Sequence, residues 1–294
     1  MKKTLDRLHK KHSRASSLQF DPLFLLDRSL SPLDQEIIGF LLAGLAYGRV
    51  EQIQKSASSL LAIMEKAGCG PTGLDVHQKL LSPNFQNAFA QNIRGWKHRL
   101  NTETDLIQLF YILGQALKMH GSLKALMANS RASAVTETLI SFSSALSAYS
   151  PKPEKQFRSK SKKWSGTGPS WFFASPQDGS SCKRLMLWLR WMVRKNDIDP
   201  GPWNSIKLVE MPISQSELLI PLDVHVFRWA QKEKVTQYKT PSWKAVIEIS
   251  AHLRKIEPRD PLRYDFAIFQ ESFQEIRKGG RALSKESKLK TQSQ

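Results

Sequence analysis

The sequence is poor in cysteine, in long apolar runs and in acidic side chains. Cys69 and Cys182 are its only cysteines, too few for a disulfide framework, a four-thiolate zinc site or an iron–sulfur cluster. The longest apolar run, residues 37–48, is too short to cross a bilayer and is flanked by Glu36 and Arg49. The basic N-terminus lacks the apolar stretch of a secretory signal. We therefore expect a soluble, cytoplasmic protein without membrane association.

The signatures of several catalytic sites are also missing. The seven histidines are dispersed, without the spacing of metal ligands. The sequence contains no phosphate-binding glycine loop and no readable arrangement of Ser, His and Asp. We expect no metal site and no cofactor.

Alternating strand patterns are scarce, and helical spacing of apolar residues dominates. Ser31 and Pro32 form a helix start, followed by Ile37, Leu41 and Leu45 on a helical pattern. The sequence predicts an all-α protein of about a dozen helices. Further helices are expected over residues 50–66, 102–120, 132–149, 180–195, 223–232, 241–256 and 261–277.

Composition divides the chain into two helical regions with basic segments around them. Residues 151–170 mix Pro, Lys, Ser and Gly with almost no apolar content, which is typical of a loop or linker. We expect two helical lobes with a cleft between them. The predicted division is a basic N-terminal segment at 1–19, a lobe at 20–150, the linker at 151–170, a second lobe at 171–277 and a basic disordered tail at 278–294.

Positive charge is concentrated in short segments. Residues 1–14, 152–163 and 277–294 each hold six Lys or Arg and one acidic residue, and together they carry +15 of the formal net charge of +18. These segments are either solvated tails and a loop, or they attract a polyanion, most simply nucleic acid. They lack the amphipathic apolar face that binding to a membrane surface requires.

A turn rich in Ser and Gly leads into the predicted helix at 180–195, which has several cations and no acid. Free backbone N–H groups at a helix start, beside such a turn, form an anion site. The alternative is a core helix whose cations face water. Five of the eight tryptophans lie between residues 164 and 203. The candidate residues here are Ser180, Ser181, Lys183, Arg184, Arg190 and Arg194.

Asp223 follows an extended Ile-Pro-Leu segment and opens another helical pattern. Aspartate is a preferred N-cap, so capping alone explains its presence. A catalytic role is compatible with capping, because the same N–H groups hold a carboxylate rigidly and keep it ionised.

The stretch Pro-Leu-Asp-Val-His-Val-Phe-Arg around Asp223 resembles the Val-Asp-Thr-His-hydrophobic-x-Arg stretch of helix–hairpin–helix DNA glycosylases of the endonuclease III superfamily. Upstream, Gly-Ser-Ser-Cys-Lys-Arg resembles a degenerate form of their Gly-x-Gly-x-Lys hairpin. The resemblance implies that Lys183 is a lyase nucleophile and Asp223 its catalytic carboxylate partner. Lys183 and Asp223 are 40 residues apart, about twice the separation usual in that superfamily, so we expect residues 197–216 to loop out.

The chain also resembles, over most of residues 20–277, an uncharacterised bacterial family known only as a domain of unknown function. The resemblance implies membership of a family without naming an activity. The motifs that carry it are Leu-Ala-Tyr47-Gly-Arg49-Val, Cys-Lys-Arg-Leu-Met-Leu-Trp-Leu-Arg-Trp-Met-Val-Arg-Lys, Pro-Leu-Asp-Val-His and Asp260-Pro-Leu-Arg-Tyr-Asp265-Phe-Ala-Ile-Phe.

Three functional hypotheses follow. The first is a base-excising DNA glycosylase or abasic-site lyase, with Lys183 and Asp223 catalytic. The second is a non-catalytic helical protein that binds nucleic acid, DNA rather than RNA being the expected partner. The third is a protein-interaction scaffold whose basic segments aid solubility. The residues expected to contact nucleic acid are Ser180, Ser181, Arg184, Arg190, Arg194, His225, Arg228, Tyr47 and Arg49.

Overall fold

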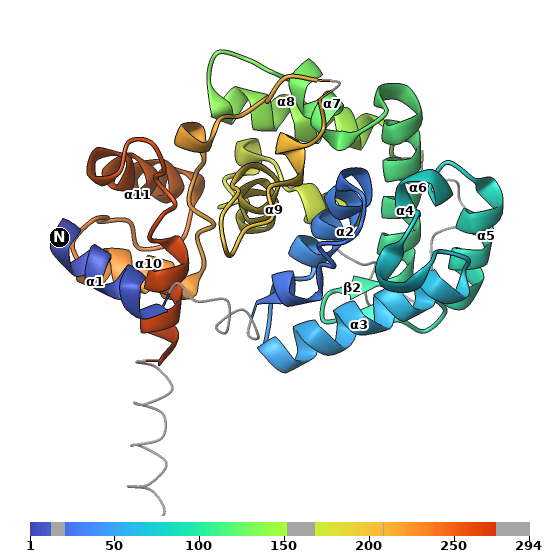
Figure 1. Ribbon diagram of the computed structural model, residues 1–294, viewed down its shortest axis with the longest axis horizontal. Helices are drawn as coiled ribbons and strands as arrows, with labels where there is room; N and C mark the ends of the chain where they lie inside the picture. Colours follow the sequence, from blue (N-terminus) through green and yellow to red (C-terminus); the bar gives the residue numbers. More distant parts are fainter. Residues whose placement is uncertain (13–20, 152–167, 208, 275–294) are drawn as a thin grey trace, which may run out of the picture.

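A computed structural model of the chain describes residues 1–12, 21–151, 168–207 and 209–274. The predicted all-α class is confirmed, since the described residues hold a single two-stranded antiparallel sheet, β1 (Lys97–His98) with β2 (Asn101–Thr102). No helix within them is long and apolar enough to cross a membrane. The helices are α1 (Lys2–His12), α2 (Pro32–Gly44), α3 (Val50–Lys66), α4 (Val76–Lys79), α5 (Pro83–Asn92), α6 (Glu103–His120), α7 (Leu123–Asn129), α8 (Val135–Ala148), α9 (Lys183–Val193), α10 (Val224–Lys232) and α11 (Trp243–Ile256), followed by a helix at 265–274 (Figure 1).

Local capping signals fix several of these helix ends. The Ser31 side chain accepts a hydrogen bond from the Asp34 N–H at the start of α2. Thr102 and Asp105 form a capping box at the start of α6, which ends at Gly121 in the left-handed conformation. The helices predicted over 50–66 and 102–120 are confirmed almost to the residue.

Helix α9 lies at the centre of the molecule against α2 (Figure 1). Every residue of 185–193 is buried, and the Trp188 ring meets Phe40, Phe142 and Trp203 at centroid distances of 5.0, 5.8 and 5.2 Å. The tryptophans of this segment are therefore largely core residues. Buried side chains from α1 to α11 form one continuous cluster, so the two predicted lobes share a core.

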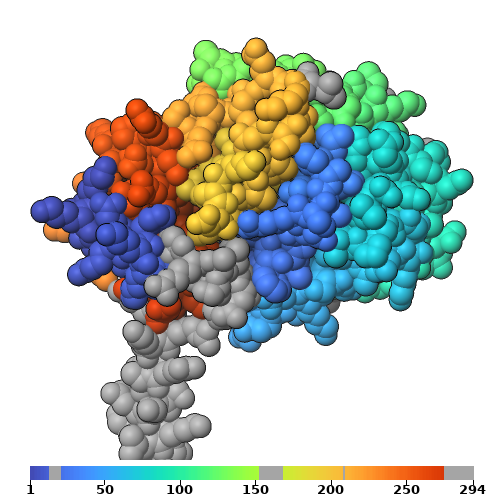
Figure 2. Space-filling model, in the orientation of Figure 1, coloured from blue at the N-terminus to red at the C-terminus, as the bar shows by residue number. Residues whose placement is uncertain are grey.

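Residues 1–12 of the first basic segment are part of the fold. Helix α1 buries Leu5 and Leu8 and lies against the C-terminal part of the chain, as Figure 2 shows by the contact of dark-blue and red-orange surfaces. The Tyr264 hydroxyl donates to Asp6 at 2.8 Å, and Lys11 pairs with Glu271 at 2.7 Å. The basic segments at 152–163 and 277–294 lie outside the described residues.

The prediction that residues 197–216 loop out is wrong. Ile198, Trp203 and Ile213 in this segment are buried, and the Trp203 Nε1–H donates to the buried Glu36 carboxylate at 2.7 Å. Apolar side chains anchor the segment to the α2–α9 core because leaving them in water would cost free energy. This segment, which links α9 to α10 in the chain, thus packs against the α2–α9 core.

Candidate functional site

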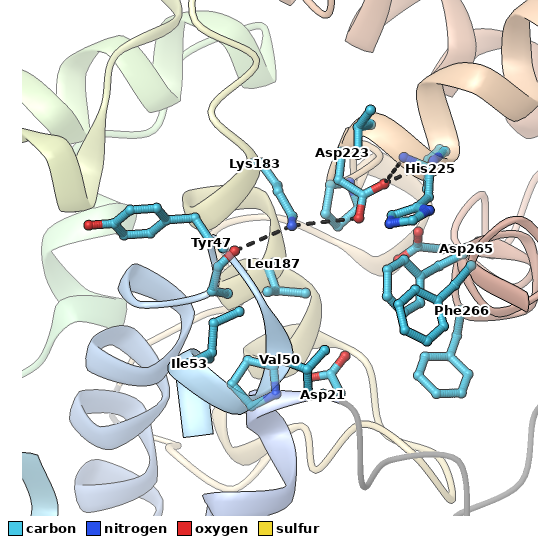
Figure 3. Close-up of a pocket in the computed structure, with 18 of the residues that line it drawn as sticks. Asp21, Tyr47, Val50, Ile53, Lys183, Leu187, Asp223, His225, Asp265 and Phe266 are labelled. Atoms are coloured by element: carbon cyan, nitrogen blue, oxygen red, sulfur yellow. Dashed lines mark hydrogen bonds and ion pairs between the residues drawn. The ribbon is translucent and has the colours of Figure 1, made fainter. Parts of the chain in front are cut away.

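A cavity of about 640 Å³ opens where α9 meets the starts of α3 and α10 (Figure 3). Its walls come from residues 46–53, from α9, from residues 221–226 and from the helix at 265–274, with residues 21–22 closing one side. It lies within the size range of ligand sites, about 300–1,000 Å³. Segments remote in the sequence meet here, so the cavity is a product of the tertiary fold.

Lys183 is the first residue of α9, and its side chain reaches into this cavity. The turn before it contains Gly179 and Cys182 in the left-handed region, with φ of 71° and 48°. The Cys182 N–H donates to the Ser180 Oγ at 3.1 Å, which fixes this turn. Lys183 Nζ donates to the Ala46 carbonyl at 3.3 Å, and 30% of the side chain is exposed. The ammonium group is thus held at the cavity wall while remaining accessible.

Asp223 is the N-cap of α10. Its Oδ1 accepts hydrogen bonds from the backbone N–H groups of His225 and Val226 at 2.8 and 2.9 Å. Its Oδ2 points to Lys183 Nζ at 3.6 Å, and 11% of the side chain is exposed. One carboxylate oxygen therefore caps the helix and the other is left for the site, so capping and a catalytic role are geometrically compatible. As predicted, Lys183 and Asp223 lie at two helix starts and open to one cavity (Figure 3).

An aromatic wall stands beside this charged pair. Phe266, Phe269 and Phe273 line the cavity from one helix. The His225 ring contacts Phe269 and Phe273 edge to face, with centroid distances of 5.4 and 5.5 Å. Burial lowers the pKa of His225, helped by Lys183 and Arg228 and opposed by Asp223, so the imidazole is neutral near pH 7. A flat apolar group can pack on this wall while its polar end meets Lys183 and Asp223.

Arg190 and Arg194 are engaged inside the protein. Arg190 pairs with Asp199 at 3.0 Å and with Asp265 at 2.7 Å, and Arg194 pairs with Asp199 and, at 2.7 Å, with Asp260. Burial raises the pKa of Asp265 to about 6 although Arg190 opposes the shift. These guanidinium groups are paired and almost wholly buried. We therefore assign Arg190 and Arg194 a structural role beside the cavity, instead of the predicted contact with nucleic acid.

Replacing Arg190 by methionine should strongly destabilise the fold. The substitution leaves Asp199 and Asp265 buried without this counter-charge, at a cost of about 3–5 kcal/mol. Urea denaturation measures the loss. Arg131→Met is the matched control, because Arg131 and Glu217 form a pair whose side chains are 38% and 33% exposed, worth about 1 kcal/mol at most.

The Arg190→Met deficit should also depend on pH. An acid whose folded pKa is raised stabilises the fold below its unfolded pKa and loses that contribution as pH rises through the folded value. Loss of Arg190 raises the Asp265 pKa further, since Arg190 lowers it more than any other group does. The deficit should therefore be smaller at pH 5 than at pH 8. An equal deficit at both values would show that Asp265 is not the group left uncompensated.

The remaining predicted residues are distributed around the cavity. Arg49 and Tyr47 line the cavity. The Tyr47 hydroxyl lies 2.8 Å from the His98 carbonyl oxygen and 2.5 Å from Asn101 Oδ1, so its one proton is shared between two acceptors. Ser180 and Ser181 lie in the turn before α9. Arg228 instead lines a separate cavity of about 290 Å³ between α1 and α10. The structure therefore does not bring Arg228 together with Lys183.

The sequence predictions missed Asp21 and the phenylalanine wall. Asp21 caps a short 3-10 helix (Pro22–Leu25) through the Leu23 N–H at 2.9 Å, and burial raises its pKa. The three phenylalanines recur at i, i+3 and i+7, a spacing that was available in the sequence. It could have indicated one aromatic helix face, though not that the face lines a cavity.

The described residues contain no group of three or more His, Cys, Asp or Glu side chains arranged to hold a metal ion. The charged and titratable groups that line the cavity include one ammonium group, the guanidinium groups of Arg49 and Arg190, several carboxylates and a neutral imidazole. This set suits acid–base or nucleophilic chemistry on an organic group.

The family model described as a protein of unknown function, DUF2400, matches residues 21–274. The match covers most of the chain, so the chain belongs to this family, and the predicted membership of a domain-of-unknown-function family is confirmed. No curated protein and no solved structure matches the chain. The similarity to endonuclease III stays a prediction.

Proposed function

We propose that this member of the DUF2400 family binds DNA and acts on one nucleotide held in the cavity, as a base-excising glycosylase or an abasic-site lyase. The observation that carries the proposal is the 3.6 Å pair of Lys183 and Asp223 in a cavity with an aromatic wall. An amine and a carboxylate beside a stacking surface are what such a reaction requires.

The Lys183 amine would act as nucleophile after losing a proton, and Asp223 is the carboxylate placed to take it. On a nucleotide, the nitrogen attacks C1′, the glycosidic bond breaks, and its electron pair leaves with the base, which takes up a proton from solvent. On an abasic site, the amine adds to the aldehyde and water leaves. On the first route the nitrogen lone pair then forms the C1′=N bond while the C1′–O4′ bond breaks, the ring opens and O4′ takes up a proton. Both routes therefore end in an imine between Lys183 and the sugar.

Asp223 would have a second task in base release. Positive charge develops on the sugar as the base departs, and a fixed carboxylate beside C1′, once the proton from Lys183 has passed on to solvent, stabilises that charge. The two N–H bonds to Oδ1 hold the group in place before the reaction starts. Little reorganisation is then needed as the charge appears.

Charge and shape support nucleic acid as the partner. The chain carries a formal net charge of +18, and Lys2, Lys3, Arg7 and Lys10 are exposed on α1. Cations of this kind displace counterions from phosphates and bind nucleic acid without reading its sequence. The aromatic wall supports a base turned out of the stack, because ring stacking offsets part of the unstacking cost of roughly a few kcal/mol.

Borohydride trapping tests this proposal. The full chain is incubated at low salt with duplexes carrying an abasic site or one of a panel of damaged bases, and borohydride reduces any imine to a stable amine. We expect a covalent adduct, and peptide mapping should place the sugar on Lys183. DNA binding without an adduct on any duplex would favour the non-catalytic binding protein. An adduct on another lysine would overturn the assignment of Lys183.

A further inference from the structure

Arg184 lies next to Lys183 in the first turn of α9, but it does not line the cavity. Its guanidinium carbon lies 3.9 Å from the centre of the Trp171 ring and 5.5 Å from that of Tyr47. Tyr47 and Trp171 in turn meet edge to face at 5.6 Å. The guanidinium group thus rests on a shelf made by two aromatic rings, which we call the Trp171–Tyr47 shelf.

No counter-charge for Arg184 occurs within the described part of the chain. It makes no ion pair and no hydrogen bond there, unlike Arg190 and Arg194 on the same helix. Burial lowers its pKa to about 10, so the group is still charged at pH 7. The two titratable groups that oppose this shift stay neutral near pH 7, because burial raises the pKa of Cys182 to about 12 and that of Tyr47 above its usual value.

The shelf holds the guanidinium group in place. The Tyr47 hydroxyl is fixed by its bonds to the His98 carbonyl and Asn101. The Trp171 Nε1–H is buried and has no acceptor in the described residues. With one guanidinium face covered by Trp171, the N–H groups at its edge are what a ligand can reach. Such a planar fork matches the oxygens of a phosphate or carboxylate better than the face of a base.

The shelf is coupled to the cavity through two consecutive residues. Lys183 Nζ donates to the Ala46 carbonyl at 3.3 Å, and Arg184 packs on the ring of the next residue, Tyr47. The Tyr47 side chain points away from the cavity that its backbone lines (Figure 3). An anion bound by Arg184 would therefore lie on the flank of the cavity.

We infer that Arg184 on the Trp171–Tyr47 shelf binds one phosphodiester of the strand whose nucleotide occupies the cavity. This inference rests on the proposed function for the identity of the strand. The contact would fix the register of the strand, so that the sugar of one nucleotide is presented to Lys183. Phosphate contacts of this kind set position without reading sequence.

The test uses binding alone, so it does not depend on catalysis. The affinity of the full chain is measured by anisotropy for a duplex with a tetrahydrofuran abasic analogue, which cannot form an imine. A set of otherwise identical duplexes replaces one phosphate at a time, on either side of the analogue, by a neutral methylphosphonate. Arg184→Met keeps the contact with Trp171 through its thioether but removes the charge.

We expect Arg184→Met to weaken binding roughly tenfold, as loss of one charged hydrogen-bonded contact does. The slope of log K against log salt should become shallower by about 0.9, the value for one phosphate on duplex DNA. At one phosphate position the methylphosphonate should weaken binding by wild type but have little further effect on the variant. Arg94→Met, which replaces an exposed arginine just beyond the end of α5, is the control and should leave the phosphate scan unchanged.

Two results would overturn the inference. One is wild-type affinity and salt slope in Arg184→Met. The other is a loss of affinity that is the same with every methylphosphonate, which would make Arg184 a general source of positive potential. The proposed function can fail separately, since an absence of trapping on reactive abasic duplexes would leave the coupling between Arg184 and one phosphate intact.

Discussion

Replacing Lys183 by arginine should abolish borohydride trapping while DNA binding is kept. Arginine retains the positive charge and can still pair with Asp223 across the cavity. A guanidinium group, however, remains protonated in proteins and has no free amine to attack C1′. Adduct formation on an abasic duplex should therefore fall to the background seen without protein. The affinity for an unreactive analogue should change by a few-fold at most.

Lys195→Arg is the matched control for this variant. Lys195 is exposed just beyond the end of α9 and does not line the cavity. It should trap abasic DNA as well as wild type does. Full trapping in Lys183→Arg would show that another amine reacts and would remove the nucleophile assigned above. Loss of trapping in both variants would show that a Lys-to-Arg change near α9 impairs trapping whether or not the residue lines the cavity, and would remove the support for Lys183 as the nucleophile.

Helices with their own start and stop signals could be predicted from the sequence. Helix α6 carries a capping box and a terminal glycine within its own sequence, and α3 shows a regular apolar face. Helix α1 has only Leu5 and Leu8 as buried apolar residues among many cations. What holds it is the distant segment around Tyr264 and Glu271. A contact across some 260 residues of chain has no local sequence signal.

The role of a site residue could be predicted from the sequence where its residue type and its neighbours indicate a single role. Asp223 follows an extended proline segment, so its place at a helix start could be predicted. The roles of Arg190 and Arg194 could not, since they depend on three aspartates contributed by other segments. A helix rich in unpaired cations and a helix whose cations are paired inside the core have the same local sequence.

The aromatic wall illustrates a limit of periodicity. Phe266, Phe269 and Phe273 follow the spacing of a buried helix face, which is normally packed by other side chains. In this fold that face meets a cavity instead, because α9 and the start of α10 approach it with Lys183, Leu187 and His225 and leave space between them. Whether a helix face is covered by other side chains or lines a cavity depends on how the side chains of several elements pack together.

Replacing Asp223 by asparagine should separate its role as a helix cap from its role in base release. It keeps an acceptor oxygen for the His225 and Val226 N–H groups, and Asn caps a helix about as well as Asp. It removes the charge of the oxygen that faces Lys183 at 3.6 Å. We therefore expect base release from a damaged duplex to slow by about 100- to 1,000-fold, the effect of losing one preorganised electrostatic contact. The unfolding free energy should stay nearly constant.

Two further variants make this result interpretable. Asp223→Ala removes the cap as well and should lower the unfolding free energy by about 1 kcal/mol. Ser242→Ala loses a comparable cap at the start of α11, where the Ser242 Oγ accepts from the Ala245 N–H at 3.4 Å. It should destabilise the protein while leaving the base-release rate unchanged, because α11 contributes nothing to the cavity lining. Single-turnover rates together with urea denaturation measure both quantities. A wild-type rate in Asp223→Asn would reduce Asp223 to a helix cap, and the mechanism built on the Lys183–Asp223 pair would then be wrong.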